Sequence, residues 1–304
     1  FALLWLLCHQ SRFKEGGGLG CWLERWSEEA EEQGAQALER LRDGVQKSIE
    51  TLGAGFLSNT ENKSLIHDLQ SGELTEHEFY GQILRLVYRL IFLCVAEDRD
   101  LLHPDGTSQN SKTNYSNYFS LKHLRELAQN VRGSSHSDLW ESQRLVQNQL
   151  SVEKGGPELG LPALGGIFGN ERTTDIINSR LSNLHFLKAL RSLCFVQETY
   201  GRRPVDFRNL GSEELGSVYE ALLELHPEMD RVAGTYSLDA YVGNARKTSG
   251  SYYTPTSLIQ ELLNSALDPV VENSLKGKKN EEAEETLLNL KVCDPACGSG
   301  HFLV

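Results

Sequence analysis

Near the end of the sequence, one glycine-spaced stretch carries residues suited to ligand binding. Leu290, Val292 and Cys293 predict a short buried strand, which Asp294 and Pro295 end because proline cannot donate a ladder hydrogen bond. Gly298 and Gly300 then allow a tight turn and a close approach of a ligand to the backbone. A strand, a glycine-rich turn and a helix start together predict a site for polar ligand groups.

This turn matches neither of the common nucleotide-binding patterns. The dinucleotide fingerprint requires a third glycine, and a phosphate loop requires Gly-Lys-Ser/Thr, neither of which follows Gly300. An ordinary strand-to-helix turn, in which Asp294 only caps the residues that follow, remains open as an alternative.

A second stretch, residues 248–255, reads Thr-Ser-Gly-Ser-Tyr-Tyr-Thr-Pro. Thr254 is a good N-cap residue, and Pro255 suits the first position of a helix. The helix that follows is predicted to place one apolar face inward, formed by Leu258, Ile259, Leu262, Leu263, Ala266 and Leu267. By itself the stretch is equally consistent with a capped helix start that packs two tyrosines.

Four segments resemble the large type IIG restriction–modification and phage-defence DNA methylases. Asp-Pro-Ala-Cys-Gly-Ser-Gly-His-Phe-Leu resembles motif I, the S-adenosyl-L-methionine-binding turn of the amino DNA methyltransferases. Ser-Gly-Ser-Tyr-Tyr-Thr-Pro resembles their motif X, and motif X shortly before motif I is the order of the N6-adenine group. Residues 206–223, with Leu-Gly-Ser-Val-Tyr-Glu, resemble the helix before motif X, and residues 96–104 resemble a phrase of the helical domain.

The resemblance implies an S-adenosyl-L-methionine site and a double-stranded DNA substrate modified at adenine N6. The turn would hold the methionine part of the cofactor, and Asp294 would accept hydrogen bonds from an ammonium group or from loop amides. Carried over residue by residue, the cofactor site comprises Tyr252, Thr254, Pro255, Asp294, Pro295, Ala296, Gly298 and Gly300.

The catalytic motif of this family, Asp/Asn-Pro-Pro followed by an aromatic residue, is absent from the sequence. The chain has eight prolines, and no two of them are adjacent. We therefore expect no catalytic residue within these 304 residues and no activity from them alone. Both ends cut through predicted structure, so we expect a piece of a longer protein.

The charge of the chain limits how it can meet nucleic acid. The formal net charge is −12, so the surface as a whole does not attract DNA. Any contact with DNA must be made by a local patch of basic residues. The best candidates for phosphate contacts are five basic residues, with scattered solvated bases as the alternative: Arg202, Arg203, Arg208, Arg246 and Lys247.

The six cysteines are widely spaced, without a C-x-x-C pair or a histidine pattern that predicts zinc. They are best interpreted as free thiols in a reducing cytosol, which predicts a cytoplasmic protein with no metal site. The apolar segment at residues 1–8 is too short to cross a membrane, so no membrane partner is expected.

We expect a mainly α fold, with a helical domain followed by the start of a Rossmann-like α/β methyltransferase domain. The expected divisions are an N-terminal helical segment (residues 1–70), a helical bundle (71–242) and the methyltransferase start (243–304). Helices are predicted at residues 22–52, 76–99, 121–131, 139–150 and 181–196, and a polar loop at 105–118.

The helix at residues 76–99 begins with a Thr-x-x-Glu capping box, Thr75 and Glu78. Its middle is apolar nearly all round, which is typical of the central helix of a bundle. Arg85 and Arg89 interrupt this run. We expect them to pair with the acidic residues at positions 97 and 98; contact with DNA is the alternative.

Two other functions compete with a DNA adenine methyltransferase. One is a non-enzymatic helical adaptor that binds a partner or DNA and retains only a remnant of the cofactor turn. The other is a methyltransferase that acts on RNA or protein. An Asn-Pro-Pro-Tyr sequence downstream would favour the DNA enzyme.

Overall fold

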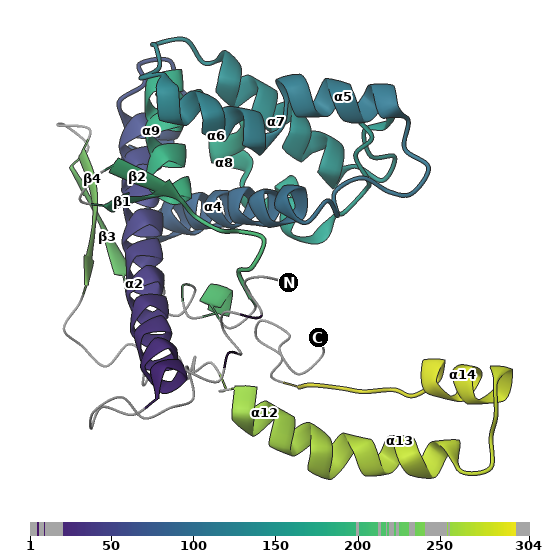
Figure 1. The fold of residues 1–304 in the computed structure, drawn as a ribbon. Helices are drawn as coiled ribbons and strands as arrows, with labels where there is room; N and C mark the ends of the chain where they lie inside the picture. The colour runs from purple at the N-terminus through teal and green to yellow at the C-terminus, as the bar shows by residue number, and fades with distance from the viewer. Residues whose placement is uncertain are drawn as a thin grey trace. The chain divides into compact units, whose positions relative to one another are not determined.

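The computed structural model describes Trp5, His9 and residues 21–198, 201–211, 214–216, 218, 222, 225–230, 235–240, 254 and 256–295 (Figure 1). The chain divides into two compact units. Unit 1 contains residues 1–205 and 229–237, and unit 2 contains residues 206–228 and 238–304. The prediction of a mainly helical chain is confirmed, whereas the Rossmann-like sheet remains a prediction, because the described strands form only two-stranded sheets.

Unit 1 is a helical domain with one small ribbon. Its helices are α2 (Trp22–Leu57), α3 (Lys63–Ser71), α4 (Glu76–Asp98), α5 (Gln109–Tyr118), α6 (Leu121–Asn130), α7 (Asp138–Ser151), α8 (Thr174–Ile177) and α9 (Asn183–Cys194). Short 3₁₀ turns follow α7 at η2 (Pro157–Leu159), η3 (Gly166–Phe168) and η4 (Asn170–Arg172). The ribbon of unit 1 is an antiparallel sheet of strands β1 (Phe195–Glu198) and β2 (Gly201–Pro204). Strands β3 (Leu225–Asp230) and β4 (Thr235–Ala240) form a second two-stranded sheet, whose residues are divided between the two units.

The core of unit 1 forms where α2 meets α9, with α4 running across α2 (Figure 1). The α2 residues Val45, Ile49, Leu52 and Phe56 are fully buried. Gly44 permits the close approach of α2 to α9, because a Cβ there would stand 2.5 Å from the carbonyl oxygen of Ser192. Burial of this α2 face, at about 25 cal/mol per Å² of apolar surface, holds the helices together.

Three aromatic rings in edge-to-face contact extend the core from α2 to α7 and α9. The Trp140 ring meets Phe56 edge-on at 5.7 Å between centroids and Phe186 at 5.8 Å. The Trp140 indole nitrogen donates a 2.9 Å hydrogen bond to the carbonyl oxygen of Ser179, so its one polar atom is satisfied. Edge-to-face geometry of this kind adds about 1 kcal/mol to the burial of each ring pair.

Helix α4 is the buried central helix of unit 1, as its pattern predicts. Thr75 Oγ1 accepts from the amide of Glu78, and the Glu78 carboxylate accepts from the amide of Thr75, which confirms the capping box. Among the described residues, α4 is also the one helix with the length and apolar composition to cross a membrane, but 67% of that window is buried inside the protein. Burial of this extent identifies α4 as a core helix.

The expected pairing of Arg85 and Arg89 with the acidic end of α4 is wrong. Arg89 is fully buried and donates to the carbonyl oxygens of Ile167 and Gly169 and to the side-chain oxygen of Gln147. Arg85 donates to the carbonyl oxygen of Arg172. Both arginines donate to the segment of short 3₁₀ turns after α7, at η3 and η4. The backbone of this segment is irregular, so its carbonyl oxygens need hydrogen-bond donors from elsewhere in the protein.

The acidic residue Glu97, at the end of α4, binds the start of α6 instead of the arginines of its own helix. The Glu97 carboxylate accepts from the amides of Leu121 and Lys122 at the start of α6 and from the hydroxyl of Tyr115. Residues 105–118 are correspondingly not a loop throughout, because Gln109–Tyr118 forms α5. Ser108 caps this helix and buried Tyr115 anchors it, which compensates for its polar composition.

Candidate functional site

The helix that follows Thr254 forms one wall of the candidate site in unit 2. It comprises α12 (Thr256–Leu262), a π-helical stretch η5 (Leu263–Leu267) and α13 (Asp268–Leu275). Pro269, in the first turn of α13, has no amide hydrogen to donate to the preceding turn. The amide of Asp268 instead bonds the carbonyl oxygen of Leu263, five residues back, and the helix widens there.

The stretch Leu290–Pro295 forms the opposite wall, after helix α14 (Glu281–Leu288). The expected buried strand is not formed, because residues 290–294 have no ladder partner among the described residues. Lys291, Val292 and Cys293 are exposed, with Val292 at 55%. A strand requires a neighbour for its backbone groups, and without one the apolar pattern yields only an irregular segment.

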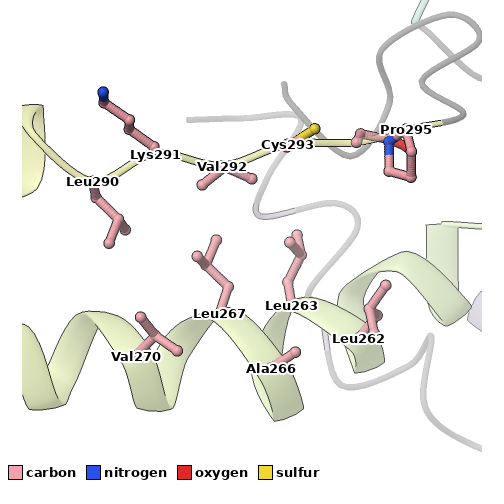
Figure 2. Close-up of a pocket in the computed structure, with 11 residues that line it drawn as sticks. Leu262, Leu263, Ala266, Leu267, Val270, Leu290, Lys291, Val292, Cys293 and Pro295 are labelled. Atoms are coloured by element: carbon pink, nitrogen blue, oxygen red, sulfur yellow. The ribbon is translucent and has the colours of Figure 1, made fainter.

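Between these walls lies an apolar groove with a volume of about 460 Å³. Figure 2 shows the segment running over the helix, with Leu290 toward Val270 and Pro295 toward Leu262. The segment therefore runs opposite to the helix, and its carboxyl end approaches the helix start. The lining residues are Leu262, Leu263, Ala266, Leu267, Val270 and all six residues from Leu290 to Pro295.

Three of the eight predicted site residues fall in the described part of the chain. Asp294 and Pro295 line the groove, Asp294 partly buried and Pro295 exposed. Thr254 is partly buried and precedes the first residue of α12 by two positions. Because a helix rises 1.5 Å per residue, the start of α12 lies only about 9 Å along its axis from Leu262, at the Asp294 end of the groove.

The other five predicted site residues lie outside the described residues: Tyr252, Pro255, Ala296, Gly298 and Gly300. The inward face predicted for α12 is partly wrong. Ile259 is buried, but Leu258 and Leu262 are 62% and 50% exposed, because no layer of described chain covers that side. Sequence reasoning also missed Val270 as a lining residue, although its position three residues after Leu267 continues the apolar face.

Comparisons with known proteins find similarity to DNA methylases. Residues 213–304 match the family model of the N-6 DNA methylases. The type II restriction enzyme and methyltransferase RM.Eco57I of Escherichia coli is 26% identical over 232 residues, which cover 76% of this chain and 18% of that protein. The chain thus spans less than a fifth of the length of this relative. No solved structure matches the chain significantly.

The matched region contains both the helix after Thr254 and the turn at Asp294, the two parts that the groove brings together. Residues 213–304 are therefore the part of the chain that is similar to the N-6 DNA methylases.

Proposed function

We propose that this chain is the helical domain and the beginning of the catalytic domain of a DNA methyltransferase. The enzyme would transfer a methyl group from S-adenosyl-L-methionine to adenine N6 in double-stranded DNA, within a cytoplasmic restriction–modification or phage-defence system. One observation carries the proposal. Asp294 and Pro295, which begin the motif I-like turn, share a groove with the helix that begins beside motif X-like Thr254.

The chemistry of the groove fits the cofactor. Its walls are mainly aliphatic, which suits the adenine ring and the methylene chain of S-adenosyl-L-methionine. Asp294 lies at one end as a carboxylate, able to accept hydrogen bonds from an ammonium group or from ribose hydroxyls. Such a placement would orient an amphiphilic molecule along the groove, with its polar end toward the turn.

When bound, the cofactor supplies the reactive methyl group on its sulfonium sulfur. The residues of this chain would bind and orient it: Asp294 through its carboxylate, Thr254 from the start of α12, and the glycines of the turn by close backbone approach. None of these residues is assigned to the target adenine, because the Asp/Asn-Pro-Pro-aromatic motif is absent from this sequence.

The test is methyl transfer by the full-length product of the gene. The protein is incubated with double-stranded DNA and radiolabelled S-adenosyl-L-methionine, and the nucleosides are separated. Label in N6-methyladenine is expected, and Asp294→Ala should reduce it at least tenfold at low cofactor concentration.

Glu272→Ala removes the same charge from an exposed residue of α13 outside the groove, and it should leave incorporation unchanged. Absence of label in DNA would overturn the proposal and favour the helical adaptor. Label in RNA or protein alone would overturn the assignment of the substrate.

A further inference from the structure

A two-stranded ribbon at the end of α9 presents basic side chains to solvent. Strand β1 continues directly from α9 and pairs antiparallel with β2, with Val196 opposite Arg203 and Gln197 opposite Arg202. All four residues of β2 are exposed. The amide of Val205 donates to the carbonyl oxygen of Cys194, so the ribbon is fixed to the last turn of α9 at its open end.

A further cation, Arg191 of α9, is held beside this ribbon by backbone groups. Its Nε donates to the carbonyl oxygen of Ala128 at 2.7 Å, and its Nη2 to that of Val131 at 2.8 Å. These carbonyls belong to the end of α6, where the helix dipole favours a positive charge. The guanidinium is therefore fixed in place by two backbone carbonyl oxygens.

Two exposed cations lie next to groups that belong to or bind Arg191. Lys188 precedes it by one turn of α9, on the same side of the helix. Arg132 directly follows Val131, whose carbonyl oxygen Arg191 binds. Together with Arg202, these residues form what we term the basic cluster: Arg132, Lys188, Arg191 and Arg202.

The cluster holds like charges close together. Burial lowers the pKa of Arg191, and the positive charge of Arg202 lowers it further. In the described part of the chain, none of the four residues takes part in an ion pair. On a chain of net charge −12, cations that lie together with no acidic partner among the described side chains are suited to an anion from outside.

We propose that the basic cluster is a surface that contacts the phosphate backbone of double-stranded DNA. Lys and Arg supply most phosphate contacts in protein–DNA complexes, and such contacts position the protein without reading sequence. A two-stranded ribbon is also an element that fits the surface of a duplex. The proposal rests on the proposed function, which makes DNA the substrate, and it gives unit 1 the task of holding the duplex.

The test measures the affinity of the 304-residue chain for a fluorescently labelled 30-base-pair duplex. Fluorescence anisotropy reports binding at several salt concentrations. Lys188→Ala with Arg202→Ala removes two exposed charges and leaves the anchored Arg191 in place. We expect about a tenfold loss of affinity at low salt and a decrease of about two in the slope of log K against log salt. Circular dichroism verifies that the variant folds.

The matched control is Lys63→Ala with Lys154→Ala, which removes two exposed charges from α3 and from the segment after α7. It should lose less than twofold in affinity. Equal losses in both variants, no loss in the cluster variant, or no binding of DNA by the unmodified chain would each overturn the proposal. Tighter binding of single-stranded RNA than of duplex DNA would overturn the assignment of the partner.

Methyl transfer by the full-length protein separates the two proposals. If the cluster variant methylates DNA with an unchanged KM for DNA, the cluster proposal fails and the methyltransferase proposal stands. If the full-length protein binds DNA through the cluster but transfers no methyl group, the methyltransferase proposal fails and the cluster remains a DNA-binding surface.

Discussion

Arg125 of α6 and Asp98 of α4 form a two-pronged salt bridge, with nitrogen–oxygen distances of 2.6 and 3.0 Å. Only 14% of the Arg125 side chain and 24% of the Asp98 side chain is exposed. Burial by itself would lower the pKa of Arg125, but the hydrogen bonds to Asp98 and nearby negative charge raise it overall. The pair therefore joins two helices of unit 1 in a setting from which water is largely excluded.

Removing one partner of this pair should destabilise unit 1. We expect Arg125→Ala to lower the free energy of unfolding by about 2–3 kcal/mol, because Asp98 would stay buried without its cation. Denaturation by urea measures the change. The control is Arg180→Ala, whose pair with Glu61 is 56% and 62% exposed and should contribute less than about 1 kcal/mol. Equal losses in the two variants would contradict this account of the buried pair.

Glu97 should make the stability of unit 1 depend on pH. Burial raises the pKa of Glu97 above its ordinary value of 4.5, although the Tyr115 hydroxyl and the amides of Leu121 and Lys122 oppose the shift. Above pH 4.5 the folded state then binds more protons than the unfolded state, so stability falls as pH rises through the window between the two pKa values.

Glu97→Gln removes the titrating group and should flatten this decline. The measurement compares urea denaturation of the two proteins at closely spaced pH values from pH 4.5 upward. The same slope in both proteins would show that other groups cause the dependence.

The contact between α2 and α9 should not tolerate a side chain at Gly44. A methyl group there would meet the carbonyl oxygen of Ser192 at 2.5 Å, which forces the helices apart. We expect Gly44→Ala to cost about 1–3 kcal/mol despite the better helix propensity of alanine.

Gly81 supplies the matched control for Gly44. It lies inside α4, and a Cβ would meet nothing within 4 Å. Gly81→Ala should therefore stabilise the protein by about 0.5–1 kcal/mol. Thermal denaturation that shows the same sign of change for both variants would contradict the packing of α2 against α9.

Local signals in the sequence predict helix starts well. The box formed by Thr75 and Glu78 is present as predicted, since it depends only on residues three positions apart. Helix α5 is missed because its stability depends on one buried residue, Tyr115, and on a distant acceptor, Glu97. Propensity alone cannot reveal such a contact.

Partners distant in the chain explain the remaining errors. Arg89 binds groups 58 to 80 residues away, so neighbouring acidic residues give a false expectation. The strand predicted at Leu290–Cys293 depends on neighbours that the described chain does not provide. Within the candidate site, the residue types at Asp294 and Thr254 can be recognised from sequence, but the groove between the walls emerges only from the fold.

The most direct test of the central claim is cofactor affinity, measured by calorimetric titration of the full-length protein with S-adenosylhomocysteine. Loss of a charge-assisted hydrogen bond corresponds to about 1.5–3 kcal/mol, so Asp294→Ala should bind roughly 10- to 100-fold more weakly. Glu272→Ala should bind as the unmodified protein does. Equal affinity of the Asp294→Ala and unmodified proteins would contradict the assignment of this turn to the cofactor.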